Sequence, residues 1–283
     1  MKGAKRTIVI LGLALASCRG PVFSPTATPQ AVHVRLWATT AAAPLLQDAL
    51  AAYRPAQTLP VVESATLSWA TVQQRLLAGE VSFALTSYVS PSARLWAAPV
   101  GWDGIAVVVH TSNDVPALTL AQVRQLFQGQ IQSWDEVGGP SLAVTVVSRE
   151  AGSGTRHTFE AQVMGQARVT WGARLALSSE GVLAIVRSTP GAVGYVSMAY
   201  LDANVRAVPL RRNAEDAPHP PTPQAVSAGA YPLRAPLLIV GAAPPAPDSY
   251  YYGWIAWLQS DAGQAVVARR YAPLRALAPA AAG

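Results

Sequence analysis

The regular alternation of strand-like and helix-like segments is the feature that most restricts the fold of this chain. Beyond residue 30, short β-branched or apolar runs are separated by segments with apolar residues at helical spacing. Strands that alternate with helices in this way predict parallel pairs in an α/β fold. The expected strands are residues 32–39, 59–65, 81–87, 104–110, 142–147, 191–198 and 235–240. The expected helices are residues 43–54, 69–79, 118–129, 156–165, 179–188 and 251–271, the last with a break near Gly263.

The first residues predict export. A basic start, MKGAKR, precedes the apolar run 7–16, which is too short to span a bilayer because a span needs roughly 20 residues. The sequence LASC (15–18) resembles the lipobox of bacterial lipoproteins, in which the cysteine becomes the lipid-carrying N-terminus. We therefore expect a signal peptide over 1–17, a lipid on Cys18, a flexible tether over 18–30 and an extracytoplasmic protein held at the membrane. An ordinary signal peptide with an incidental cysteine is the alternative.

Charge and composition argue against several classes of function. The formal charge of +6 falls to +3 when residues 1–17 are removed, and basic residues do not cluster, so we expect no nucleic-acid partner. The four histidines lack ligand spacing and the chain has a single cysteine, so we expect no metal and no cofactor. No pair of acids and no base beside a candidate nucleophile suggests catalysis, so we expect a protein that is not an enzyme.

The stretch SREAGSGTRHTFE (148–160) is the clearest candidate for a binding site. It joins an expected strand to an expected helix through a glycine turn, and the unpaired N–H groups of a helix start favour anions. Arg149 would supply a positive charge, and Ser153 and Thr155 would supply hydroxyl donors. The structural alternative is that Ser153 is only an N-cap, the glycines only form the turn, and Arg149 is a solvated strand end.

Several motifs together resemble the phosphate-binding proteins of bacterial ABC transporters. Besides 148–160 they are DGIAVVV (103–109), residues 118–139, TPGAVGYVSMAYL (189–201) and SAGAYPLRAPL (227–237), in the order that the family shows. The resemblance implies a two-lobed periplasmic-binding-protein-like fold, with two crossover strands as a hinge and a ligand cleft between the lobes. It implies a first lobe of residues 31–100 plus 228–275 and a second lobe of residues 101–227.

The resemblance also implies a set of ligand contacts. Two positions depart from the family. Trp69 follows Ser68 where the family has a small residue, and Ser82 stands where the family motif has an acidic residue that accepts a hydrogen bond from protonated phosphate. We expect weaker exclusion of sulfate as a result. The implied contacts are Thr40, Ala41, Ser68, Ser82, Arg149, Ser153, Gly154 and Thr155.

The function that the resemblance implies is a monomeric, lipid-anchored receptor. It would bind inorganic phosphate or a similar tetrahedral oxyanion and deliver the ligand to an ABC transporter permease. Two alternatives stay open: a receptor for sulfate, molybdate or tungstate, and a surface sensor lipoprotein that is not coupled to transport.

Overall fold

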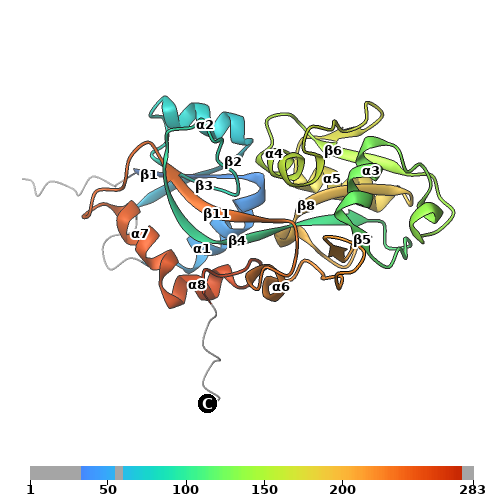
Figure 1. Cartoon of the computed structure of the whole chain (residues 1–283). Coiled ribbons are helices and arrows are strands. Elements are labelled where there is room, and N and C mark those ends of the chain that lie inside the picture. The colour runs from blue at the N-terminus through green and yellow to red at the C-terminus, as the bar shows by residue number, and fades with distance from the viewer. Residues whose placement is uncertain (1–32, 55–59, 276–283) are drawn as a thin grey trace, which may run out of the picture. The chain divides into compact units, whose positions relative to one another are not determined.

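The structure is a computed structural model that describes residues 33–54 and 60–275 (Figure 1). The predicted signal peptide, the predicted lipid site Cys18 and the predicted tether lie outside the described residues. None of the helices in the described part of the chain has the length and apolar character that crossing a membrane requires.

The longer strands form one large mixed sheet in the order β2-β1-β3-β11-β4-β8-β6-β7. β1 (His33–Thr39) pairs in parallel with β2 (Val61–Leu67) and with β3 (Phe83–Thr86), as the alternation predicts. β11 (Arg234–Gly241) is antiparallel to both β3 and β4 (Trp96–Val109), so the sheet is not parallel throughout. β4 is also antiparallel to β8 (Ala192–Ser197), whereas β6 (Thr145–Arg149) is parallel to β8 and to β7 (Arg174–Ala176).

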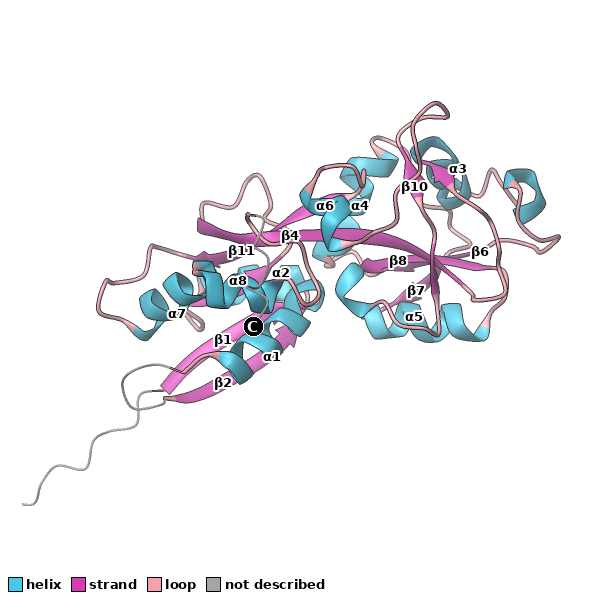
Figure 2. Cartoon of the chain, turned by 90° about the horizontal axis from the view of Figure 1, so that it is seen from below, coloured by secondary structure: helices cyan, strands magenta, loops and turns pink. Residues whose placement is uncertain are grey.

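Two lobes are built on this sheet. β4 runs through both of them, whereas β11 pairs with residues 96–104 of β4 and stays on the side of the first lobe (Figures 1 and 2). The first lobe carries β1, β2 and β3 with α1 (Ala43–Ala52), α2 (Trp69–Leu77), α7 (Tyr250–Gln259) and α8 (Asp261–Val267). The second carries β6, β7 and β8 with α3 (Leu120–Gln128), α4 (Gly154–Phe159), α5 (Ser179–Ser188) and α6 (Pro223–Ser227). The short strands are β5 (Leu118–Thr119), β9 (Arg206–Ala207) and β10 (Leu210–Arg211).

The main difference from the sequence prediction is the length of β4. The strand was expected at 104–110, but it starts at Trp96 and has 14 residues. Pro99 and Gly101 weaken the strand signal in its first half. The sheet accommodates them at an irregularity in the pairing with β11, where the register shifts between Leu237 and Leu238. A bulge of this kind is a place where a sheet tolerates proline.

Helix ends follow the local sequence signals closely. The Thr119 side chain caps α3, and Gly129 ends this helix in the left-handed region at φ 75°. α5 spans the predicted residues. The expected helix over 251–271 is two helices, α7 and α8, and the break is at Ser260 rather than near Gly263. Ser260 ends α7, and its hydroxyl accepts the N–H of Gly263 as the N-cap of α8.

Candidate functional site

A cleft of about 620 Å³ lies between the two lobes. The first lobe lines it with Thr40, which follows β1, and with Ser68, which precedes α2. The second lobe lines it with Glu150, Ser178 and Tyr200, among others. Two of the residues that the sequence places at the site, Thr40 and Ser68, therefore face the second lobe across a cavity.

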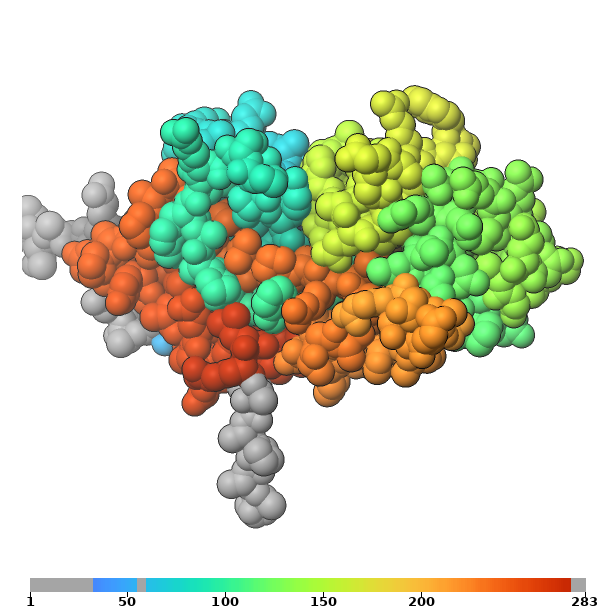
Figure 3. Space-filling view, in the orientation of Figure 1, coloured from blue at the N-terminus to red at the C-terminus, as the bar shows by residue number. Residues whose placement is uncertain are grey.

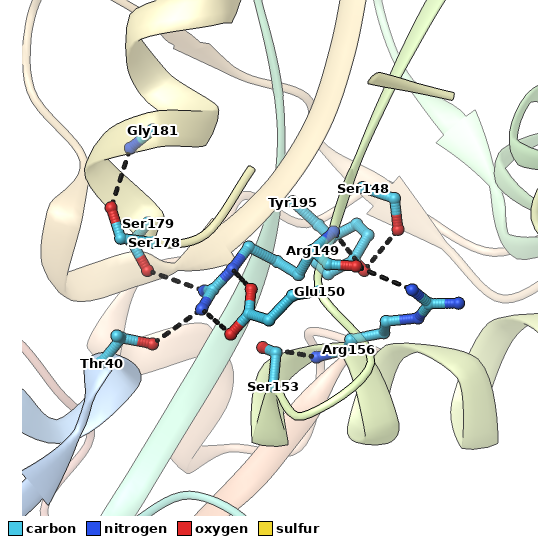
Figure 4. A network of polar contacts seen from close by, with 10 residues as sticks. All are labelled: Thr40, Ser148, Arg149, Glu150, Ser153, Arg156, Ser178, Ser179, Gly181 and Tyr195. Carbon is cyan, nitrogen blue, oxygen red and sulfur yellow. Dashed lines mark hydrogen bonds and ion pairs between the residues drawn. The ribbon is translucent and has the colours of Figure 1, made fainter. Parts of the chain in front are cut away.

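Arg149 is at the carboxyl end of β6 and is completely buried. Its Nη2 donates to Thr40 Oγ1 at 3.2 Å, across the cleft, and its Nη1 donates to Ser179 Oγ at 3.5 Å (Figure 4). The Glu150 carboxylate accepts from Arg149 Nε at 2.9 Å and from Nη2 at 3.0 Å. This burial contradicts the alternative in which Arg149 is a solvated strand end.

The start of α4 supplies a buried polar surface next to Arg149. Ser153 caps the helix by accepting the N–H of Arg156 at 3.3 Å, so the N-cap interpretation is correct for its hydroxyl. Arg156 in turn donates from Nη1 to the carbonyl of Arg149 at 2.8 Å. Thr155 is 2% exposed, and its Oγ1 has no hydrogen-bond partner. A buried hydroxyl without a partner is costly, which makes this atom a candidate for contact with a ligand.

The glycines of this stretch allow the lobes to approach closely. A Cβ on Gly152 would lie 3.2 Å from Ala70 Cβ, and a Cβ on Gly154 would lie 3.0 Å from Tyr88 Cβ. The Gly152 carbonyl also accepts the N–H of Ala70, at the start of α2, at 3.2 Å. Larger residues at either position would hold the two lobes apart.

The first lobe presents its predicted residues at the carboxyl ends of parallel strands. Thr40 and Ala41 belong to the short 3-10 helix Thr40–Ala42, and Ala41 is 1% exposed. The Ser68 hydroxyl caps α2 by accepting from the N–H of Thr71 at 3.3 Å. Trp69, which stands where the family favours a small residue, is buried, packs edge-on against Tyr88 and does not line the cleft.

Ser82 is not brought together with the other predicted residues. The register of β1 and β3 pairs Leu36 with Phe83, so Ser82 lies level with Arg35, whereas Thr40 is five residues further along. At about 3.3 Å per residue this is a separation of about 16 Å. Ser82 lines a different hollow, with Arg35 and Glu63 among its neighbours. The structure thus corrects the expectation for Ser82, because ligand-facing positions are at the opposite end of the strand.

Several cleft residues were missed by sequence reasoning. Ser179 reaches Arg149, and Glu150, Ser178, Glu180 and Tyr200 line the cavity. Tyr200 donates its hydroxyl to the Thr40 carbonyl across the cleft. Burial raises the pKa of the Tyr200 hydroxyl, and the carboxylate of Glu180 raises it further, so this group stays a neutral donor. The one feature of the sequence that could have pointed to Ser178, Ser179 and Glu180 is the stretch SSEG (178–181), a typical helix start.

A buried ionisable group, Asp103, lies outside the cleft lining, where β4 passes between the lobes. Asp103 is fully buried and pairs with Ala235 of β11. Its Oδ1 accepts from Ser197 Oγ at 2.8 Å, and its Oδ2 has no partner. Burial raises the pKa of the Asp103 carboxyl to about 8, although the hydrogen bonds from Ser197 and from two backbone N–H groups oppose this.

Metal binding has no support in the side-chain arrangement of residues 33–54 and 60–275. In these ranges no three or more His, Cys, Asp or Glu side chains gather into a group that could hold an ion.

A two-lobed α/β protein with a buried arginine and converging hydroxyls in an interlobe cleft is of the periplasmic-binding-protein class. A sequence model of the PBP superfamily domain matches residues 24–262, and the chain belongs to this superfamily. The resemblance seen in the motifs is thereby confirmed. The chain is 33% identical over 133 residues to the phosphate-binding protein PstS of Bacillus subtilis, a match that covers 47% of this chain and 42% of the relative.

Other relatives agree with this assignment. The PstS of Pseudomonas aeruginosa PAO1 is 27% identical over 64% of this chain and 60% of its own length. The chain thus spans less than two thirds of the curated relatives it matches. Among solved structures, a substrate-binding protein of Clostridium perfringens, named for a phosphate ABC transporter and holding phosphate, aligns with a TM-score of 0.78 and 26% identity, covering 86% of this chain and all of that chain. An ABC-type phosphate transport receptor of Vibrio cholerae aligns with a TM-score of 0.67 and 26% identity, covering 84% of this chain and 99% of that chain.

Proposed function

We propose that this protein is an extracytoplasmic receptor, anchored by a lipid on Cys18, that binds phosphate or a related tetrahedral oxyanion and delivers it to an ABC importer. The observation that carries the proposal is the completely buried Arg149 between the hydroxyls of Thr40 and Ser179, which belong to different lobes. A buried cation with hydroxyl donors on both sides of a cleft favours a small anion with several oxygens.

Arg149, Ser153, Gly154 and Thr155 form the second-lobe wall of the proposed site, and Thr40, Ala41 and Ser68 form the first-lobe wall. The free hydroxyl of Thr155 suits a ligand oxygen, because the burial of an anion requires nearly all of its oxygens to be hydrogen-bonded. Both carboxylate oxygens of Glu150 already accept hydrogen bonds from the Arg149 guanidinium. An entering oxyanion would therefore share the guanidinium with this carboxylate or displace it.

The relatives support phosphate as the ligand and transport as the role. The Bacillus subtilis and Pseudomonas aeruginosa relatives are named phosphate-binding proteins, and the Clostridium perfringens structure holds phosphate. We extend both properties to this chain, and with them the role of a receptor rather than an enzyme, on the strength of the shared fold and of the motifs. The division into lobes at 31–100 plus 228–275 and 101–227 is part of the same proposal.

Thr155 offers a sharp test of the site. Thr155→Val keeps the shape and removes the free hydroxyl, so the loss of one hydrogen bond to a charged ligand should cost about 1.5–3 kcal/mol. This corresponds to a roughly ten- to 150-fold increase in the phosphate Kd in a calorimetric titration. Thr158→Val is the matched control on the same helix, because the Thr158 hydroxyl already donates to the Gly154 carbonyl at 3.1 Å. Equal phosphate affinities of the two variants would show that the Thr155 hydroxyl does not contact the ligand.

The same titration, repeated with sulfate, molybdate and tungstate, decides which oxyanion is preferred. Phosphate should bind most tightly, and a tighter complex with another of these anions would overturn the choice of ligand while keeping the site. A sensor role in place of transport is favoured if the neighbouring gene encodes a sensor kinase rather than a permease.

A further inference from the structure

The buried carboxyl of Asp103 is connected by hydrogen bonds to the residues that close the cleft. Ser197 Oγ donates to Asp103 Oδ1 at 2.8 Å, and the same hydroxyl caps the short 3-10 helix Met198–Tyr200. Tyr200, at the end of this helix, donates its hydroxyl across the cleft to the Thr40 carbonyl at 2.5 Å. Asp103 therefore holds the segment that carries one of the bonds between the lobes.

A second tyrosine relates the same carboxyl to the first-lobe wall of the proposed site. Tyr271 is completely buried and donates its hydroxyl to the Ala41 carbonyl at 2.7 Å. Burial raises the pKa of the Tyr271 hydroxyl, and the carboxylate of Asp103 raises it further, so the two groups are within electrostatic reach of each other. Thr40 and Ala41 thus both have their carbonyls held by a tyrosine that the charge of Asp103 affects.

Three tyrosine hydroxyls are the titratable groups that face Asp103 in the described part of the chain. Tyr200 belongs to the 3-10 helix, Tyr231 follows α6 and Tyr271 follows α8. Burial raises the pKa of each of these hydroxyls, and the Asp103 carboxylate adds to the rise in all three. Tyr195 of β8 turns its hydroxyl toward β6 instead. The carboxyl is therefore surrounded by neutral hydrogen-bond donors.

The arginines of the elements packed against Asp103 are engaged elsewhere. Arg234 of β11 has its guanidinium over the ring of Trp102, 4.7 Å from the centroid. Arg270 donates from Nε to Asp48 at 3.0 Å. Among the described residues no cation acts on the pKa of the Asp103 carboxyl, which burial raises and hydrogen bonds lower. A negative charge on this group would therefore be uncompensated.

Ionisation of this carboxyl would disturb the first-lobe wall. Oδ2 of Asp103 has no hydrogen-bond partner, and a buried carboxylate oxygen without a donor is costly. Its charge would attract the hydroxyl protons of Tyr200 and Tyr271 away from the carbonyls that they now hold, and it would repel a bound anion. We propose that Asp103 is a positioning residue that keeps the anion site in order only as an un-ionised acid, so that its ionisation weakens anion binding. This inference rests on the proposed function, whose regulation by pH it describes.

The direction of the pH effect follows from the closed arrangement of the lobes. Figure 3 shows cyan atoms of the first lobe against yellow-green atoms of the second, where the N–H of Ala70 donates to the Gly152 carbonyl. In this arrangement burial raises the pKa of Asp103 to about 8. Below that pH the carboxyl is neutral and binding is at full strength, and above it binding weakens. Because linkage is reciprocal, anion binding near pH 8 should take up a proton.

Calorimetric titration with phosphate between pH 6.5 and pH 9 tests the proposal. Asp103→Asn keeps an oxygen for the Ser197 hydroxyl and cannot ionise, whereas phosphate changes its own charge equally for both proteins. The wild-type Kd should rise about fivefold more than that of Asp103→Asn, since one linked proton changes affinity at most about tenfold per pH unit. Asp202→Asn is the matched control, because Asp202 forms an exposed pair with Arg187 in the second lobe, and it should keep the wild-type pH profile.

A second measurement needs no phosphate. In urea unfolding, a double-mutant cycle of Asp103→Asn with Tyr271→Phe should show a coupling at pH 9 that is absent at pH 6.5, because only the ionised carboxyl attracts the tyrosine hydroxyl. Tyr271→Phe alone should also reduce the pH-dependent loss of phosphate affinity. This keeps the test decisive even where Asp103→Asn binds poorly at every pH.

The outcomes separate the two hypotheses. Phosphate binding with the same pH profile in wild type and Asp103→Asn, or a profile that Asp202→Asn flattens equally, overturns the role of Asp103 and leaves the receptor standing. A cycle without coupling at pH 9 overturns that role as well. Coupling at pH 9 in a protein that binds no phosphate at any pH refutes the receptor and supports the action of Asp103 on Tyr271.

Discussion

Removal of the Arg149 guanidinium is the most direct test of the anion site. This side chain is completely buried and is bonded to Glu150, Thr40 and Ser179. Arg149→Ala would leave a bound anion without its counter-charge, and breaking a buried ion pair costs about 3–5 kcal/mol. The phosphate Kd measured by calorimetry should therefore rise by roughly two to four orders of magnitude. Arg149→Lys should recover only part of the loss, because an ammonium cannot present two parallel donors.

Two controls separate binding from folding in this experiment. Arg149→Ala also leaves Glu150, whose side chain is 20% exposed, without its partner, and this alone can destabilise the fold. The double variant Arg149→Met with Glu150→Gln removes both charges at similar volume, so it should fold and still fail to bind. Arg35→Ala deletes the same charge at an exposed pair with Glu63 and should bind normally. Unchanged affinity in a folded Arg149→Ala protein would refute the site.

The remaining predictions concern the buried Asp103, the closure of the cleft, Ser82 and the lipid on Cys18. Because burial raises the pKa of Asp103 in the folded protein from the ordinary aspartate value of 3.8 to about 8, the protein should lose stability relative to Asp103→Asn as pH rises from about 4 to about 8, by on the order of 5 kcal/mol in total. A difference in the free energy of urea unfolding between the two proteins that stays constant over this pH range would contradict the prediction. The bonds that bridge the lobes, such as Arg149 to Thr40, should break on opening, so small-angle scattering should give a smaller radius of gyration with saturating phosphate than without it; identical profiles would indicate a cleft that stays closed. Ser82→Asp should leave the ratio of phosphate to sulfate affinity unchanged, since Ser82 lines another hollow, and a shifted ratio in competition titrations would return it to the site. The wild-type protein should incorporate labelled palmitate and the Cys18→Ser variant should not. Absence of label in the wild-type protein would contradict the lipid anchor.

The sequence by itself determined the local elements and the family. Periodicity and caps placed α3 between Thr119 and Gly129, and α5 at its observed bounds, because these signals act within one turn of a helix. The motif around Arg149 was recognisable for the same reason. A strand, a glycine turn and a helix start are consecutive in the chain, and their geometry is fixed by neighbours in sequence.

Only the tertiary structure decided how distant segments meet. The pairing with β11 extends β4 through Pro99 and Gly101, which local propensity would exclude from a strand. The register of β1 and β3 separates Ser82 from Thr40, and the packing of the two lobes brings Thr40 to Arg149, 109 residues away. The burial of Arg149 and the cleft contacts of Ser179 and Tyr200 also result from the packing of distant segments. Burial and long-range hydrogen bonds depend on how the two lobes pack, and no stretch of the sequence contains that information alone.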